Sequence, residues 1–256
     1  MNKSFIYSIL IIVILAGISL GISTNEENLT AKDIIDKANN NKFGNSSEST
    51  MEMTIVRPSW SRSITMKSWT LGKEYSMVLI TAPAKEKGQV FLKRKSEMWN
   101  WIPTISRMIK LPPSMMSQGW MGSDYTNDDM VNEGALVNEF EHTIIRMERY
   151  DDISCYVIKS IPQEESDVIW GKKLTWISID RFLPLKTESY DEEMYLVKTE
   201  TASKIKEIGG KIIPTVFTII PADDPGQKTI LTMKAVIFDN KIDETFFTQQ
   251  NMKRVR

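Results

Sequence analysis

The chain has very little of the side-chain chemistry on which most metal proteins depend. It contains one cysteine, Cys155, and one histidine, His142. A single cysteine excludes an intramolecular disulfide and a thiolate metal cluster. Because Cys155 lies in a run of strand-forming residues, a small buried side chain explains it better than a reactive thiol.

Catalytic motifs are also missing. No Gly-x-Ser-x-Gly sequence is present, so the nucleophile elbow with which His142 could form a catalytic triad is missing. His142 also has no second His or Cys at metal-ligand spacing. The acidic cluster of Asp124, Asp128, Asp129 and Glu133 lacks the glycine of an EF-hand loop, and helix capping explains it better than calcium. The sequence therefore predicts a protein that is not an enzyme, with no catalytic residue, metal or cofactor.

Charge of one sign is not in excess. The 256 residues include 32 basic and 33 acidic side chains, which gives a net charge of -1. Nucleic-acid binding needs a clustered basic surface, so no nucleic-acid partner is expected. The hydrophobic fraction of 41% is ordinary for a globular protein of this length. No linker divides the chain, and we expect residues 24–256 to form one domain.

The long apolar run of the chain lies at its start. Lys3 precedes an uncharged stretch over residues 5–22, and small residues at 21–23 precede a polar segment. These are the parts of a secretory signal peptide, which we assign to residues 1–23, with an uncleaved N-terminal anchor as the alternative. The remainder is then expected to be periplasmic or otherwise extracytoplasmic, and membrane-anchored if the signal is retained.

The body of the chain shows the period of β-strands. A helix is expected over residues 30–39, with Thr30 as N-cap and Asp33 three residues on. Alternation then begins, for example at Met51 and Met53, and predicts half-buried strands joined by short turns. In the second half, strands are expected at residues 155–161, 173–180, 185–190, 195–202, 211–220 and 229–238. Together they predict a mainly β (α+β) fold, an incomplete antiparallel β-barrel of about ten strands.

One insertion departs from this pattern. Residues 97–131 concentrate Trp and Met and are broken at Pro112 and Pro113. Ser114 and Thr126 are expected to cap short helices there. Two interpretations stay open: a helical plug that fills the barrel, and a movable lid over a cavity.

The chain resembles bacterial outer-membrane lipoprotein-sorting proteins, a LolA-like family. The resemblance covers nearly all of the chain after the signal. The segments that carry it are 53–58 (MTIVRP), 79–83 (LITAP), 91–94 (FLKR), 99–103 (WNWIP), 109–116 (IKLPPSMM), 120–124 (WMGSD), 126–129 (TNDD), 168–172 (VIWGK), 220–223 (IPAD) and 251–255 (NMKRV).

This resemblance implies an incomplete barrel with a helical lid around an apolar cavity. It also implies a carrier that takes lipoprotein acyl chains from an inner-membrane ABC-type transporter. Arg57 is the residue expected to contact a head group or partner. From strand phase and from the insertion, the side chains expected to line the cavity are Met53, Met66, Met77, Leu79, Trp99, Trp101, Met108, Met115, Met116, Trp120 and Met121.

Three functions follow from these observations. The leading expectation is an extracytoplasmic carrier of lipid or lipoprotein acyl chains. The alternative is an accessory subunit with a filled core that docks on an exporter or envelope complex without binding lipid. An extracytoplasmic hydrolase is the third and has no nucleophile constellation to support it.

Overall fold

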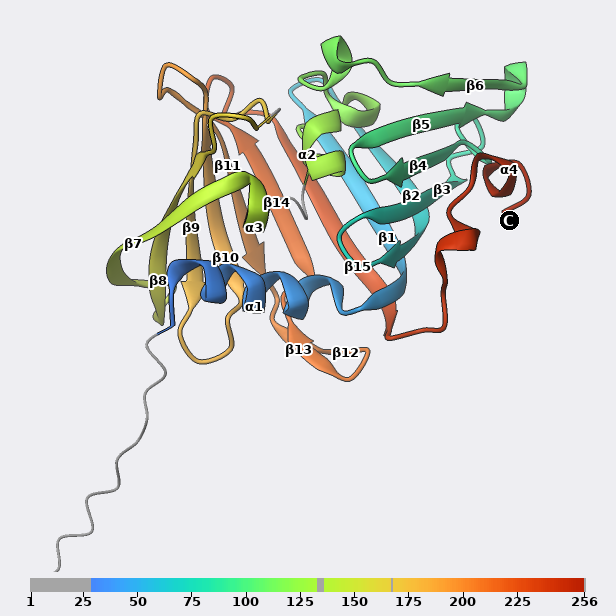
Figure 1. Ribbon diagram of the computed structural model, residues 1–256. Coiled ribbons are helices and arrows are strands. Elements are labelled where there is room, and N and C mark those ends of the chain that lie inside the picture. Colours follow the sequence, from blue (N-terminus) through green and yellow to red (C-terminus); the bar gives the residue numbers. More distant parts are fainter. Residues whose placement is uncertain (1–28, 133–135, 167, 256) are drawn as a thin grey trace, which may run out of the picture.

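The computed structural model describes residues 29–132, 136–166 and 168–255, which leaves the expected signal segment outside the described residues. Within these residues, 13 antiparallel strands form one curved sheet in the order β6-β5-β4-β3-β2-β1-β15-β14-β11-β10-β9-β8-β7 (Figure 1). β12 and β13 form a separate hairpin. Each half of the main sheet is a meander, and pairing of β1 with β15 joins the two halves.

The strands are β1 (Ser46–Arg57), β2 (Trp60–Leu71), β3 (Tyr75–Ala82), β4 (Val90–Arg94), β5 (Glu97–Ile102), β6 (Arg107–Lys110), β7 (Phe140–Tyr150), β8 (Ile153–Pro162), β9 (Lys172–Ser178), β10 (Pro184–Tyr190), β11 (Leu196–Ser203), β12 (Lys206–Ile208), β13 (Lys211–Ile213), β14 (Val216–Pro221) and β15 (Lys228–Phe238). The α-helices are α1 (Ala31–Phe43), α2 (Asn127–Asn132), α3 (Leu136–Glu139) and α4 (Gln249–Met252). Short 3-10 helices are η1 (Pro103–Ile105), η2 (Pro113–Met115), η3 (Trp120–Gly122) and η4 (Glu244–Phe246).

The mainly β, antiparallel prediction is confirmed, but the number of strands was too low. β7 was missed, and the strand expected at residues 211–220 is two strands separated at Pro214. Proline has no N–H to donate to a ladder, so the chain changes partner there, from β12 to β11. β6 and β7 are the two edges of the sheet, so it is not closed and a barrel is not confirmed.

The predicted N-terminal helix forms for the predicted reason. Thr30 Oγ1 accepts a hydrogen bond from Asp33 N–H at 3.2 Å, and Thr30 N–H donates to the Asp33 carboxylate at 2.9 Å. Ile34, Ile35 and Ala38 are buried against the sheet. No helix in the described part of the chain is long and apolar enough to cross a bilayer.

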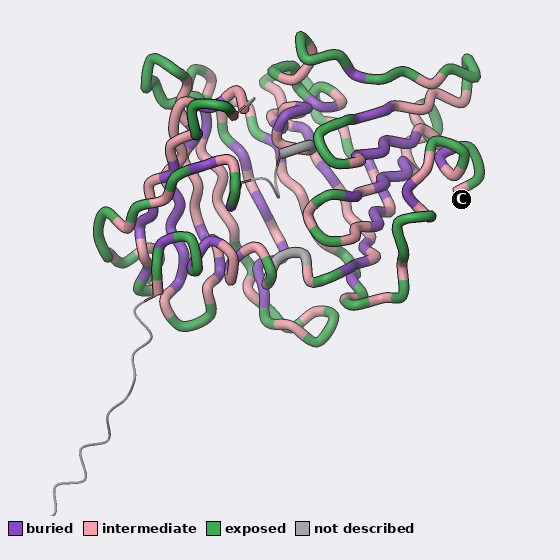
Figure 2. The backbone as a smooth tube through the Cα atoms, in the orientation of Figure 1, coloured by how far each residue is buried: buried purple, intermediate pink, exposed green. Residues whose placement is uncertain are grey.

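The outer face of β2–β5 is covered by the C-terminal segment, residues 239–255. Phe247 and Met252 are fully buried there, and the Phe247 ring lies 5.7 Å from that of Tyr75. The same cluster contains Trp69 and Met77 from the sheet. Figure 2 shows that the strands of the half that contains β2–β5 are accordingly buried over much of their length.

The C-terminal segment is expected to contribute to global stability. Phe247→Ala removes a fully buried ring and should lower the free energy of unfolding by about 3–5 kcal/mol. Urea unfolding measures this, with Met147→Ala as the control, because Met147 is 64% exposed and should change stability by less than about 0.5 kcal/mol. Equal stability of Phe247→Ala and wild type would show that this segment is not part of the core.

Candidate functional site

Two adjoining cavities lie on the inner face of the sheet. The methionine cavity is lined from β1, β2, β3, β4, β14 and β15 and has a volume of about 130 Å³. The lysine cavity is lined from α1, β9, β10, β11 and β14 and has a volume of about 110 Å³. Tyr125 and Phe217 line both. Each volume is roughly that of several water molecules, so this face is not filled by the protein's own side chains.

Much of the wall of the methionine cavity is apolar. Met53 and Met66 are fully buried in its wall, and Met130, Leu231 and Met233 line it from neighbouring elements. Methionine is unbranched and polarizable, so such a wall fits apolar partners of different shapes. The surface of this cavity therefore favours an apolar, conformationally variable occupant.

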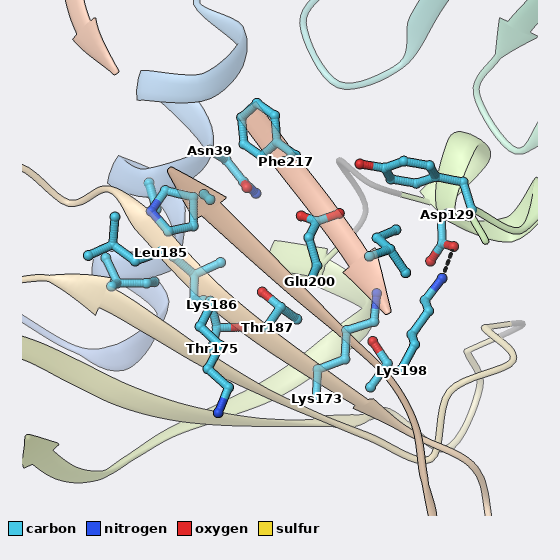
Figure 3. A pocket seen from close by; sticks show the side chains of 18 residues that line it. Asn39, Asp129, Lys173, Thr175, Leu185, Lys186, Thr187, Lys198, Glu200 and Phe217 are labelled. Atoms are coloured by element: carbon cyan, nitrogen blue, oxygen red, sulfur yellow. Dashed lines mark hydrogen bonds and ion pairs between the residues drawn. The ribbon is translucent and has the colours of Figure 1, made fainter. Parts of the chain in front are cut away.

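The lysine cavity is polar by comparison (Figure 3). Lys198 on β11 forms an ion pair with Asp129, and its Nζ also donates to Asp124 O at 3.2 Å. Burial alone would raise the pKa of Asp129, but the ammonium groups of Lys198 and Lys173 and the hydrogen bonds outweigh it, so this pKa lies below its ordinary value. Burial lowers the pKa of Lys173 in spite of the nearby Asp129.

Several polar atoms around the cavities have no hydrogen-bond partner among the described residues. They are Asn39 Nδ2 and Thr175 Oγ1 at the lysine cavity and Trp120 Nε1 at the methionine cavity. Buried polar groups are normally satisfied by protein, water or ligand. These atoms therefore give both cavities some capacity for a polar group as well as for hydrocarbon.

The roof is a cap segment, defined here as residues 112–132, which contains η2, η3 and α2. Trp120 is 2% exposed and packs edge-on against Phe91, with ring centroids 5.1 Å apart. Tyr125 joins the same cluster. Figure 1 shows α2 inside the curve of the sheet, between its two halves.

Ionic contacts and hydrogen bonds fix the cap segment to the sheet. Arg57 at the end of β1 donates to both Asp124 carboxylate oxygens, at 3.0 and 3.2 Å, and to Gly122 O at 3.0 Å. The Asp124 carboxylate also accepts from Thr229 Oγ1 at 2.6 Å. Lys198 holds Asp129 on the other side, as described above. The cap is thus attached to both halves of the sheet, through β1 in the first half and through β15 and β11 in the second.

The capping prediction was right at one end of the insertion and wrong at the other. Thr126 and Asp129 form the expected reciprocal hydrogen bonds, with Asp129 N–H donating to Thr126 Oγ1 at 3.0 Å. Ser114 is not an N-cap: η2 begins after Pro112, without a side-chain cap. The helix begins at Pro113, because proline is favoured at the first helical position, and not with a Ser114 cap.

The residues expected to line a cavity fall into two groups. Met53, Met66 and Trp120 line the methionine cavity, and Met116 and Met121 pack against the same cluster. Met115 is half-buried in η2 and lines neither cavity. Residues of the second group lie on the outer face under the C-terminal segment and line neither cavity: Met77, Leu79, Trp99, Trp101 and Met108.

The other residues singled out in the sequence have structural surroundings. Cys155 is buried, as expected. His142 lies on β7 with Nδ1 2.8 Å from Ser160 Oγ. Asp124 and Asp129 are bound to Arg57 and Lys198, and the described residues contain no group of acidic, His or Cys side chains that could hold a metal ion.

Sequence reasoning missed the polar part of the site. Lys173 and Lys198 were not singled out, although both line the lysine cavity. Neither β9 nor β11 alternates between apolar and polar residues, so the sequence provided no inward phase from which these lysines could have been found. Tyr125 and Phe217 carried no signal of their own.

The large antiparallel sheet is shared with solved structures. A DUF1329 family protein from Desulfovibrio piger is 21% identical, with a TM-score of 0.79 over 87% of this chain and 97% of that one. A domain described as an outer membrane lipoprotein-sorting protein from Vibrio parahaemolyticus is 20% identical, with a TM-score of 0.77 over 88% and 98%. A LolA superfamily protein from Nitrosomonas europaea is 25% identical, with a TM-score of 0.75 over 87% and 99%.

These likenesses define the class: the chain has the LolA-like fold of lipoprotein-sorting proteins. A family model described as that of an uncharacterized protein matches residues 72–254, more than half of the chain, and the protein belongs to that family. No curated protein sequence matches it significantly. The resemblance found in the sequence is thereby confirmed.

The Arg57–Asp124 contact is expected to hold the cap in place. Both side chains are largely buried, with 14% and 10% exposure, so Arg57→Met leaves a carboxylate without its counter-ion. We expect a loss of about 3 kcal/mol in unfolding free energy and faster hydrogen exchange in residues 118–130. Arg149→Met is the control, because its ion pair with Asp152 is on the surface. Unchanged exchange in the cap would refute this role.

The Lys198–Asp129 pair predicts an acid-sensitive cap. Because the folded pKa of Asp129 is lowered, its contribution is complete above its unfolded value near 3.9 and is lost as pH falls through the folded pKa. The difference in unfolding free energy between wild type and Asp129→Asn should therefore shrink below about pH 4. A difference that stays constant from pH 6 to pH 3 would contradict the assignment.

Proposed function

We propose that this protein is an extracytoplasmic carrier that holds the acyl chain of a lipid or lipoprotein in the methionine cavity. The observation that carries the proposal is an underfilled cavity under a cap, with Met53, Met66 and Trp120 in its wall. The LolA-like fold supports the same function, and it also supports a periplasmic location. The chain needs no catalytic group for this work, and we propose that it is not an enzyme.

Hydrocarbon burial supplies enough free energy for such binding. Each buried methylene contributes about 0.8 kcal/mol, so burial of an acyl segment supplies affinity without a dense set of polar contacts. Reversible delivery also requires a route by which the acyl chain leaves the cavity. The cap segment is suited to that role, because it lies over the cavity and its attachment includes ion pairs to β1 and β11.

In this proposal the cap segment is a lid rather than a plug. A plug would fill the space between its own side chains and the sheet, whereas here open volume remains beneath Trp120 and Met130. Lid opening exposes that volume to an incoming chain, and closure excludes water from it. By resemblance alone, we extend the proposal to a donor, an inner-membrane ABC-type transporter that hands over the lipid.

Filling the methionine cavity tests the proposal. Ser49 lines it and is 8% exposed, so Ser49→Phe places a ring in the open space. We expect the affinity for a fluorescent fatty-acid probe to fall at least about tenfold, because displaced hydrocarbon loses its burial. Native mass spectrometry of the wild type should also show bound lipid after purification.

A matched serine variant separates this effect from general damage. Ser63 is exposed on the neighbouring strand β2, so Ser63→Phe should bind the probe as the wild type does. Thermal unfolding checks that both variants fold. Full probe binding by a folded Ser49→Phe protein, or no binding by the wild type, would reject the carrier proposal in favour of a docking subunit.

A further inference from the structure

Polar side chains line the lysine cavity from the sheet and from α1. Residues that pair across β9, β10 and β11 lie side by side on one face, so the observed register defines rows of side chains. One row consists of Thr175, Thr187 and Glu200, and all three line the cavity. Asn39 lines it from α1 (Figure 3). Polar groups from two elements therefore border the same open space.

Two of these polar groups have donors that the protein does not use. Thr175 is 4% exposed, and its Oγ1 has no hydrogen-bond partner among the described residues. Asn39 Nδ2 is a buried atom that likewise has no partner in this part of the chain. A buried polar atom without a partner costs free energy, so such atoms are normally satisfied by water or by a ligand. Because both atoms can donate, they favour an occupant that brings oxygen acceptors.

The charges that line the lysine cavity are already compensated. Lys198 pairs with Asp129, and Lys186 pairs with Glu188 at 2.7 Å. Burial lowers the pKa of Lys173, and nearby carboxylates, of which Asp129 has the largest effect, oppose this shift. Each ammonium group thus already has a carboxylate near it, and an anionic ligand would have to compete with these carboxylates. An uncharged acceptor uses the unpaired donors without that competition.

The lysine cavity lies where the end of a bound acyl chain would come to rest. It meets the methionine cavity at Tyr125 and Phe217, which line both. A molecule whose tail occupies the methionine cavity can therefore place the group that follows the tail in the lysine cavity. In an esterified acyl chain that group is the ester, whose carbonyl oxygen is an uncharged acceptor.

Resting on the proposed function, we infer that the lysine cavity binds the ester carbonyl of an esterified acyl chain whose tail occupies the methionine cavity. Thr175 Oγ1 and Asn39 Nδ2 donate to the carbonyl oxygens. The protein is thereby selective for acyl esters over free fatty acids, which carry a carboxylate. Selectivity of this kind is strong because an analogue without the acceptor leaves buried donors unpaired.

A matched pair of probes isolates the carbonyl: dodecanoyl glycerol, an ester, and dodecyl glycerol, the corresponding ether. Wild type should bind the ester at least about fivefold more tightly than the ether, and also more tightly than dodecanoate. Thr175→Val keeps the shape of the side chain and should reduce the ester preference to less than about twofold, with the ether affinity unchanged. Thr143→Val, at an exposed threonine of β7, is the control and should keep the full preference.

Two further readouts separate binding from folding. Because the hydroxyl that Thr175→Val removes is unpaired, this variant should unfold at the same temperature as wild type or a higher one. Asn39→Ala removes the other donor from α1 and should also reduce the ester preference. Retention of the preference in both variants would overturn the assignment.

The probes also distinguish this inference from the carrier function on which it rests. Equal binding of ester and ether by wild type, or tighter binding of dodecanoate than of the ester, leaves the carrier function standing and overturns the ester assignment. Binding of none of the three overturns both.

The same ester occurs in free glycerolipids and in lipid-modified proteins. Competition against the bound ester probe distinguishes them, with a diacylglycerol and a peptide that carries the same diacylglyceryl group on an N-terminal cysteine as competitors. Stronger competition by the peptide assigns the ligand to lipoproteins, and equal competition assigns it to the lipid part alone. Failure of both to compete would overturn the ester assignment.

Discussion

The pairing of β1 with β15 is the constraint on which the rest of the structure depends. It joins a meander from the first half of the chain to one from the second half and makes a single curved sheet. Curvature gives that sheet an inner face with more area than α1, α2 and α3 cover. The open volume follows from this geometry, because the residues between β6 and β7 are too few and too interrupted by proline to fill it.

Two different interactions stabilise the two faces. The outer face of β2–β5 is closed mainly by aromatic and apolar packing of Phe247 and its neighbours. The inner face is roofed by a cap whose contacts combine one aromatic anchor, Trp120, with ion pairs at Arg57 and Lys198. A segment attached in this second way opens more easily than the core unfolds. In the proposed function, ligand binding and packing of the C-terminal segment therefore use opposite faces of one sheet.

The contacts of Arg57 differ from those expected from the sequence. The arginine was expected to contact a head group or partner, and it contacts the cap instead, at Asp124 and Gly122. The same residue thus contributes to holding the cap over the cavity. An interaction between Arg57 and a lipid stays a prediction.

The methionine and aromatic side chains of β1–β5 show how much of the candidate site the sequence could predict. Alternation located β1–β4 but not β5, which was assigned to the insertion, and it placed Met53 and Met66 on the face of the cavity. It could not place Met77, Leu79 or Trp99, because β3 and β5 are buried on both faces and their two phases look alike. The second burial comes from the C-terminal segment, more than 130 residues away in sequence.

By itself the sequence determined the local structure: the capped first helix, the strand period, the proline breaks of the insertion and the family resemblance. These depend on residues a few positions apart, whose interactions are the same in any fold. The tertiary structure alone decided which face is inner, that this face is left partly open, and that Lys173, Lys198 and Lys93 lie beside the open volume. Those properties depend on the curvature of the complete sheet, which no single segment encodes.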